Sequence, residues 1–321
     1  MKELVIILLS FTLNIGYAVA AERNPPILIG ALTEGFGPTS GTVGLRDGLE
    51  ELGYRENRDF FIGVRFTQGE TGALLKAAQD LVRQGVKILF TEGRSAAIAA
   101  KTATATVPIV FGGGGDPVGL GLINSFARPG GNITGVSDLD FELGPKRLEI
   151  FKEMIPGLER VLFLHHTDDT YSSVEAKSYR AAAPHLGIAL VEKGVRSRQE
   201  AKTRLSQLDK ENIEGVLSPR SMSLNIPGYI REAASRNSKP TMFSSTFFAE
   251  NGGLASYTPQ TYESGRMAAR LVDKILRGQK PGIIPVETNH KIELVINLKV
   301  ANALKITIAP QVLYRAQRVI R

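Results

Sequence analysis

The sequence contains no cysteine and no tryptophan, and only four of its 321 residues are histidine. The missing cysteine excludes disulfide bonds, thiol nucleophiles and thiolate metal sites together. The missing tryptophan leaves any stacking on a planar ligand to phenylalanine and tyrosine. After the first 20 residues, no apolar run is long enough to span a bilayer. The mature chain is therefore expected to fold without disulfides or membrane spans.

Motifs of catalysis and nucleotide binding are also missing. Gly-x-Ser-x-Gly is absent, and no order of serine, histidine and acid indicates a hydrolase. The glycine-rich segment Gly112–Pro117 has neither the Lys-Ser/Thr pair of a P-loop nor the spacing of a dinucleotide-binding loop. His165, His166, Asp168 and Asp169 look like metal ligands, but adjacent histidines on a strand point to opposite sides. We expect no enzyme activity, no cofactor and no metal, and keep a hydrolase or nucleotide-dependent enzyme only as a third hypothesis.

The charge pattern is basic but dispersed. The chain has 39 lysines and arginines against 32 acidic residues, a formal net charge of +7. Because the basic residues are scattered rather than clustered, we predict no nucleic-acid partner. Hydrophobic residues make up 43% of the chain, which is typical of a globular protein. Its length exceeds the usual size of one hydrophobic core, so two lobes are expected.

Residues 1–20 have the pattern of a cleaved signal peptide. Lys2 precedes an apolar run from Leu4 to Leu13, and Ala18-Val19-Ala20 matches a cleavage site. No cysteine follows Ala20, which excludes lipid attachment there. We therefore predict export to the periplasm. An N-terminal membrane anchor is the alternative.

Short apolar runs alternate with helical patterns along the rest of the chain. Strands are expected at residues 27–32, 60–66, 86–90, 107–111, 161–164, 188–191, 215–217, 241–243 and 291–296. Strands that alternate with helices of 10–15 residues predict parallel β-α-β units. The fold class is therefore α/β, with two doubly wound Rossmann-like lobes joined by a multi-strand hinge.

The lobe boundaries follow from where the pattern restarts. Residues 24–137 and about 244–285 are assigned to the first lobe. Residues 138–243 and about 286–321 are assigned to the second. The Gly- and Pro-rich segment 112–135 is the expected neighbourhood of the first crossing, and residues 244–257 that of the second.

Ligands of open parallel sheets bind at the carboxyl ends of the strands. The candidate residues are therefore those that follow each predicted strand, and Ser95 is also expected to cap the helix after the third. In the first lobe they are Thr33, Glu34, Thr91, Glu92, Arg94, Ser95, Gly113, Gly114 and Asp116. In the second they are His166, Thr167, Asp169, Tyr171, Arg220, Ser221, Ser244 and Ser245.

These loops favour a small polar ligand. Arg94 and Arg220 favour a carboxylate on it. Aromatic side chains in or near the same loops are candidates for contact with a planar part, and packing in the core is the alternative for each of them. They are Phe36, Tyr171, Phe243, Phe247 and Phe248.

Five further stretches carry a family resemblance. They are Val107–Phe111, Asp116–Leu120, Arg128–Gly135, Lys146–Glu149 and Glu293–Leu298. In this order and spacing, the chain resembles the substrate-binding proteins of ABC-type importers, in the group that includes the tryptophan-binding components. Two departures, His165–Asp169 in place of an Asn-Pro turn and the extra glycines of Gly112–Pro117, lie where ligand contacts are expected and leave the ligand open.

The resemblance implies a type I periplasmic binding protein. Its two lobes would close about the hinge on a small molecule held in the cleft by the candidate loops. The implied partners are the permease domains of an ABC transporter in the inner membrane, and we expect a monomer. A periplasmic ligand sensor for a membrane receptor, with the same fold, is the alternative function.

Overall fold

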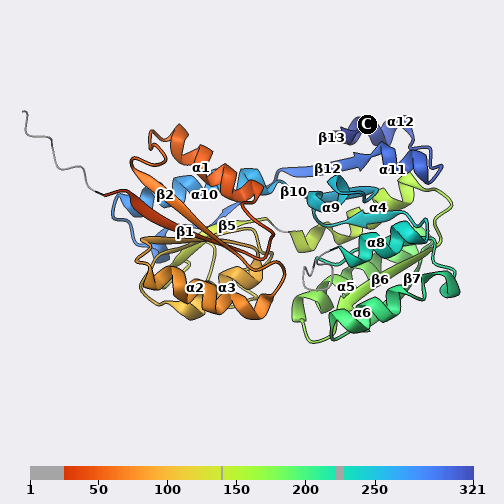
Figure 1. The fold of residues 1–321 in the computed structure, drawn as a ribbon, viewed down its shortest axis with the longest axis horizontal. Helices are drawn as coiled ribbons and strands as arrows, with labels where there is room; N and C mark the ends of the chain where they lie inside the picture. Colours follow the sequence, from red (N-terminus) through yellow and green to blue (C-terminus); the bar gives the residue numbers. More distant parts are fainter. Residues whose placement is uncertain (1–24, 139, 221–227) are drawn as a thin grey trace, which may run out of the picture.

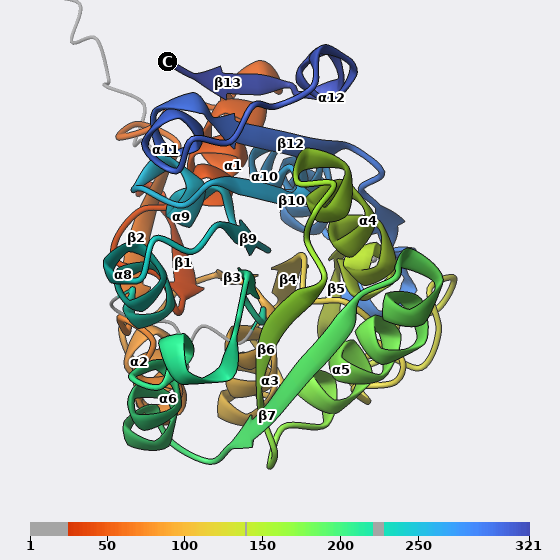
Figure 2. The ribbon, with the colours of Figure 1, turned by 90° about the vertical axis from the view of Figure 1, so that its right-hand side faces the viewer.

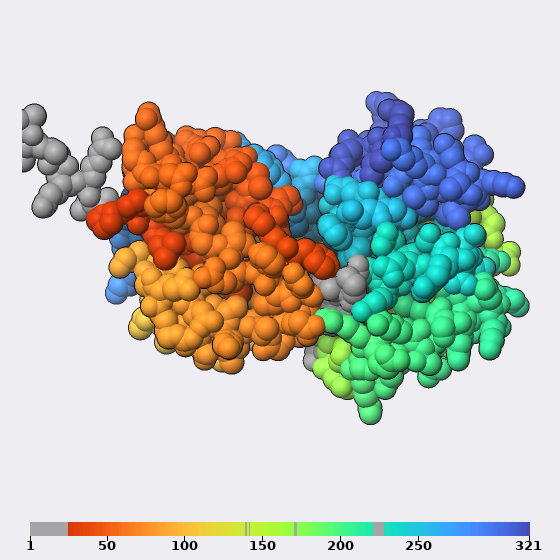
Figure 3. Space-filling model, in the orientation of Figure 1, coloured from red at the N-terminus to blue at the C-terminus, as the bar shows by residue number. Residues whose placement is uncertain are grey.

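The computed structural model describes residues 25–138, 140–220 and 228–321, without the side chains of residues 141, 170 and 171. Two α/β lobes lie side by side, each built on its own sheet (Figure 1). In the space-filling view the lobes form two bodies joined at a waist (Figure 3). No helix among these residues has the length and apolar character needed to cross a membrane. The predicted architecture of two doubly wound α/β lobes is confirmed.

The first lobe contains a parallel sheet of six strands in the order β11-β5-β4-β3-β1-β2. The strands are β1 (Ile27–Thr33), β2 (Phe60–Phe66), β3 (Ile88–Glu92), β4 (Ile109–Gly112), β5 (Ile133–Ser137) and β11 (Glu287–Thr288). Its helices are α1 (Ser40–Glu51), α2 (Leu74–Arg83), α3 (Arg94–Ala103) and α10 (Thr261–Leu276). Helices α1 and α10 cover one face of the sheet, and α2 and α3 cover the other (Figure 1).

The second lobe contains seven strands in the order β13-β12-β10-β9-β8-β6-β7. All neighbours are parallel except β10 and β12. The strands are β6 (Arg160–His166), β7 (Ala189–Val195), β8 (Gly215–Leu217), β9 (Thr241–Phe243), β10 (Ala255–Pro259), β12 (Ile292–Asn297) and β13 (Arg318–Ile320).

Helices again cover both faces of this sheet. Helices α4 (Gly144–Met154), α5 (Thr170–Ala182), α11 (Leu298–Ala303) and α12 (Pro310–Arg315) pack on one face. Helices α6 (Arg198–Leu205), α8 (Tyr229–Arg236) and α9 (Thr246–Glu250) pack on the other. Figure 2 shows α4 and α5 on one side of β6 and β7, with α6 and α8 opposite. Sheets covered on both faces need apolar side chains on both faces, which is why these strands read as apolar runs.

The first crossing falls at the assigned end of the first lobe, residue 137, although not within residues 112–135, and the second and third crossings fall later than assigned. Residues 112–135 stay in the first lobe and lead into β5, so the first crossing follows Ser137. Residues 244–257 form α9 and most of β10 in the second lobe, and the chain recrosses only after Pro259. The last crossing follows Thr288 in β11. Strand β10 is held in place by backbone pairing with β9 and β12, which an apolar pattern does not reveal.

Glycines allow α1 and α10 to pack with their backbones in contact. A Cβ added at Gly265 would overlap the carbonyl oxygen of Gly41, and one added at Gly44 would overlap that of Tyr262. Both glycines are buried between the two helices. The close approach places the start of α1 beside the second crossing, at the edge of the space between the lobes.

Candidate ligand-binding cleft

A cleft of about 810 Å³ lies between the two lobes. It is lined by the loops after β1 and β3 in the first lobe and after β6, β8 and β9 in the second. Residues 258–262, at the second crossing, line it as well. Its volume and its position at the carboxyl ends of both parallel sheets suit a small-molecule ligand.

Most of the predicted site residues line this cleft. From the first lobe these are Thr33, Glu34, Glu92, Arg94, Ser95 and Gly114, and from the second His166, Asp169, Arg220, Ser244 and Ser245. Ser95 does not cap α3, because the helix begins at Arg94 and Gly93 occupies the cap position with φ 83°. The fold therefore gathers loops that are more than 200 residues apart in the sequence around one space.

Four predicted residues do not line the cleft. Thr91 is fully buried inside β3, since neighbouring side chains of a strand point to opposite faces. Gly113 is buried, and its amide donates to Val136 at 2.8 Å. Asp116 accepts hydrogen bonds from the amides of its own turn, and Thr167 is exposed beside Asp168. Ser221 and the side chain of Tyr171 lie outside the described residues.

Two aromatic rings meet across the cleft. Phe36, after β1, and Phe247, in α9, stack with ring centroids 5.4 Å apart and planes inclined by 21°. Their side chains are 36% and 41% exposed, unlike the buried rings of the cores. Because the rings belong to different lobes, movement of the lobes changes their separation. A planar group could contact either exposed face.

Ion pairs also connect the lobes. Arg94 at the start of α3 donates to both carboxylate oxygens of Asp169, which precedes α5, at 2.8 and 2.7 Å. Arg198 of α6 pairs with Glu70 at 2.7 Å and donates to the carbonyl of Gly69 at 3.0 Å. The bidentate pair is the better defined of the two, since two parallel hydrogen bonds fix its geometry.

Glu34 is a half-buried carboxylate on the first-lobe wall. Burial raises its pKa, and a hydrogen bond from Ser95 together with the charges of Arg94 and Arg220 acts in the opposite direction. Asp169 adds to the rise, because a second negative charge disfavours ionisation. An additional positive charge beside Glu34 would therefore favour the ionised form of its carboxylate.

Glu92 lies against the start of α1. Its carboxylate accepts hydrogen bonds from the hydroxyl of Thr39 and, at 3.1 Å, from that of Thr42. An added Cβ at Gly41 would lie 2.5 Å from its Oε1, so glycine lets the carboxylate sit against this turn. Burial raises the pKa of Glu92 more than these hydrogen bonds lower it.

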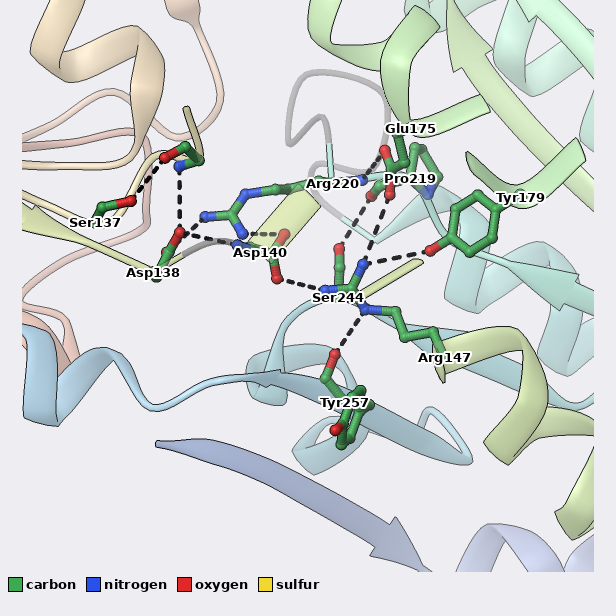
Figure 4. Close-up of polar contacts among 11 residues, drawn as sticks. Ser137, Asp138, Asp140, Arg147, Glu175, Tyr179, Pro219, Arg220, Ser244 and Tyr257 are labelled. Atoms are coloured by element: carbon green, nitrogen blue, oxygen red, sulfur yellow. Dashed lines mark hydrogen bonds and ion pairs between the residues drawn. The ribbon is translucent and has the colours of Figure 1, made fainter. Parts of the chain in front are cut away.

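Arg220 connects the cleft to the hinge (Figure 4). Its guanidinium pairs with Asp140, beside the first crossing, and lies 3.4 Å from Asp138. Its backbone amide donates to the carboxylate of Glu175 at 3.1 Å. Asp138 also accepts a hydrogen bond from the amide of Gly115 at 3.2 Å. The cleft loop after β8 is therefore fastened to the segment through which the chain leaves the first lobe.

Arg147 of α4 shares the partner Asp140 with Arg220 and is only 1% exposed. It pairs with Asp140, donates to the carbonyl of Tyr257 at 2.6 Å and to the hydroxyl of Tyr179 at 3.3 Å. Since Tyr257 belongs to β10, Arg147 ties the first crossing to the strand that leads into the second. Burial raises the pKa of the neighbouring Glu175 to about 7.

The adjacent histidines point to opposite sides of β6, as the alternation of a strand predicts. His166 lines the cleft, whereas Nε2 of His165 lies 3.0 Å from Glu192 on β7. The described residues contain no group of three or more side chains arranged to hold a metal ion.

Sequence reasoning missed Glu293 and Arg318, which also line the cleft. Glu293 lies opposite Thr258 in the antiparallel pairing of β12 with β10, and Arg318 is on β13. Residues 291–296 were expected as a strand, but the register that brings Glu293 to the cleft depends on a partner strand that was not predicted.

Comparisons with known proteins give a consistent result. The family model described as "ABC transporter substrate binding protein" matches residues 27–320. A tyrosine-binding protein of Clostridioides difficile is 27% identical over 258 residues, covering 80% of this chain and 74% of that protein.

Two solved structures are similar over nearly the whole chain. An ABC domain from Streptococcus pneumoniae in complex with L-Trp has a TM-score of 0.80 and 26% identity, covering 92% of this chain and 100% of that one. A conserved domain protein from Vibrio cholerae has a TM-score of 0.80 and 27% identity, covering 91% and 99%.

Proposed function

The chain belongs to the ABC transporter substrate binding protein family, whose members bind substrates and are not enzymes, and we propose that it is the exported solute-binding component of an importer. In this proposal, residues 1–20 direct export and are removed, and the mature protein works in the periplasm. The family supports the role of solute-binding component, and the signal-like pattern of residues 1–20 supports export. Its partners are the permease domains in the inner membrane, to which it delivers the ligand unchanged.

We propose that closure of the two lobes captures the ligand. The ligand-binding residues are the predicted ones that line the cleft, supplied by both lobes. Contacts made to both lobes at once exist only when the cleft is shut, so binding shifts the population toward that state. The pair Arg94–Asp169 supports this idea, because it joins the two walls directly.

The proposed ligand is an aromatic amino acid. A relative is a tyrosine-binding protein, and a structural neighbour holds L-Trp. In this chain, the exposed rings of Phe36 and Phe247 supply an aromatic surface from each lobe. This interlobe pair, inside a cleft of about 810 Å³, is the observation that carries the proposal.

Calorimetric titration of the purified protein tests this function. L-Tyrosine or L-tryptophan should bind with 1:1 stoichiometry, at least about tenfold more tightly than L-leucine or D-ribose. Phe247→Ala should weaken binding by a few-fold to about tenfold, the range of an aromatic contact. Phe66→Ala is the control, because Phe66 is similarly exposed, at 44%, but does not line the cleft. Continuous heat from turnover, or no saturable heat with either amino acid, would contradict the proposal.

A further inference from the structure

Arg220 lines the cleft, but two buried carboxylates hold its guanidinium. Its Nη2 lies 3.4 Å from Asp138, and its Nη1 pairs with Asp140. The side chain of Arg220 is 24% exposed, whereas those of Asp138 and Asp140 are 3% and 1% exposed. A buried carboxylate that lost its arginine would keep an uncompensated charge, so both pairs favour the present position of the guanidinium. A carboxylate on the ligand would have to compete with the two aspartates for Arg220.

Asp138 is fixed to the first lobe. It directly follows β5, which pairs with β4 and β11 in that sheet. Its carboxylate accepts a hydrogen bond from the amide of Gly115 at 3.2 Å, and the hydroxyl of Ser137 donates to the carbonyl of Gly115 at 2.9 Å. The loop after β4 therefore holds Asp138 against the first-lobe sheet.

Arg220 is fixed to the second lobe instead. It follows β8, and its backbone amide donates to the carboxylate of Glu175 in α5 at 3.1 Å. The hydroxyl of Ser244, after β9, donates to the carbonyl of the preceding residue, Pro219, at 3.4 Å. The contact from Arg220 to Asp138 therefore spans the first crossing, and rotation of one lobe against the other must change its length.

Arg147 extends this contact to the second crossing. Asp140 lies between the two arginines, with Oδ2 paired to Arg220 and Oδ1 paired to Arg147 (Figure 4). Arg147 in turn donates to the carbonyl of Tyr257 in β10 at 2.6 Å. Since β10 leads into the second crossing, these side chains connect the cleft with both crossings. Together with Asp138 they carry two positive and two negative charges.

We infer, resting on the proposed function, that Arg220 is a positioning residue that couples closure of the cleft to the hinge. It acts through Asp138 and not by pairing with a carboxylate of the ligand, so Arg220 leaves the proposed set of ligand contacts. The pair keeps the loop after β8 against the first crossing while the lobes are shut, and its loss favours the open arrangement. Ligand affinity then falls in proportion to the closed fraction.

Three variants separate this coupling from mere charge balance. Asp138→Asn and Arg220→Gln each leave one charge of the buried cluster unmatched, so both should melt at a lower temperature than the unmodified protein. The double variant Asp138→Asn/Arg220→Gln restores the balance and should melt above either single variant. Because its link between the lobes is still broken, binding should not recover together with stability.

Calorimetry with L-tyrosine and L-tryptophan measures the affinities. Each of the three variants should bind about fivefold or more weakly than the unmodified protein, the range of a coupling between two sites. Arg180→Gln is the matched control, because Arg180 forms a bidentate pair with Glu192 within the second lobe. It should leave the affinity unchanged.

The separation of the lobes is measured without any ligand. The chain has no cysteine, so Lys76→Cys in α2 and Arg204→Cys in α6 accept one spin label each. Both residues are exposed, and their helices lie on the side of the lobes opposite the crossing into β12 (Figure 1). Double electron–electron resonance should show a larger separation of the labels in the three variants than in the unmodified protein. A residue that only contacts the ligand would leave this separation unchanged.

The outcomes distinguish the coupling from the function on which it rests. Full affinity in the double variant would reduce the pair of Arg220 and Asp138 to charge balance and overturn the inference. Unchanged or tighter binding by Asp138→Asn would also overturn it, because Arg220 would then be available to a ligand carboxylate. If neither amino acid binds the unmodified protein, the proposed function fails and the label separations alone decide the inference. Separations equal to that of the unmodified protein would contradict it in either case.

Discussion

Glu175 shows how one side chain links the cleft to the hinge. Its Oε2 accepts the amide of Arg220, while its Oε1 has no hydrogen-bond partner among the described residues and lies 3.9 Å from Arg147. The cluster around it contains two arginines and the buried carboxylates Asp138 and Asp140. The two charges of each sign already balance, so a neutral Glu175 completes the cluster with the least buried net charge.

Stability should therefore respond to pH through Glu175. Its pKa rises from an ordinary 4.5 to about 7 on folding, so the folded state binds more protons between these values. Its contribution to stability is present below pH 4.5 and is lost as the pH rises through 7. Glu175→Gln, which cannot ionise, should melt about 2–4 °C above the unmodified protein at pH 8 and equal it near pH 5.

Thermal melts followed by circular dichroism at both pH values make this measurement, with Glu51→Gln as the exposed control. A Glu175→Gln variant that melts below the unmodified protein at pH 8 would mean that Arg147 needs an ionised Glu175.

At the scale of single residues, the sequence predicted many of the residues that line the cleft, but not the side chains with which they form ion pairs. A position just after a parallel strand is readable from the apolar pattern, and Glu34, Glu92 and His166 line the cleft as that rule predicts. That Arg94 pairs with Asp169, or Arg220 with Asp140, depends on how two lobes and a hinge meet. Such pairings are set by the tertiary arrangement and leave no local signal.

At the scale of elements, the contact between α1 and α10 tests the fold most sharply. Gly265→Ala places a methyl group against the backbone of Gly41, and neither backbone can move without separating the helices. We expect a loss of about 1–3 kcal/mol in the free energy of unfolding, the usual cost of overpacking. Higher helix propensity of alanine offsets about 1 kcal/mol of the strain. Urea unfolding of the variant and of the unmodified protein measures this difference in the free energy of unfolding.

Gly72→Ala is the matched control, since nothing lies within 4 Å of its added Cβ. It should leave stability nearly unchanged. Equal stability of the two variants would show that the helices do not pack as closely as described.

Strands that are apolar runs bounded by turn residues were predictable, even where they are three residues long. Strands β2, β8 and β9 begin and end at the predicted residues, because each is an apolar run bounded by turn residues. Strands β5, β10, β11 and β13 were not predicted. β10 contains Ser256 and Thr258 and gains its place from β9 and β12. β13 begins with Arg318 and lies at the edge of the sheet beside β12.

At the scale of the whole molecule, the two-lobed plan and the end of the first lobe segment at residue 137 were predictable, but the second and third crossings were not. Two repeats of alternating strands and helices indicate two sheets from the sequence alone. Which sheet a short strand joins depends on competing backbone pairings. β10 therefore belongs to the second lobe and β11 to the first, whereas the sequence assigned each to the other lobe. The interlobe contacts, Phe36 with Phe247 and Arg94 with Asp169, arise only at this scale.

Hydrogen–deuterium exchange with and without saturating ligand tests the central claim, that one small molecule is held by both lobes at once. The ligand is L-tyrosine or L-tryptophan, whichever binds more tightly in calorimetry. The account predicts slower exchange in residues 33–40 and 92–95 of the first lobe and in residues 166–169 and 244–248 of the second, all at the cleft. Slower exchange in only one lobe, or in segments remote from the cleft, would contradict it.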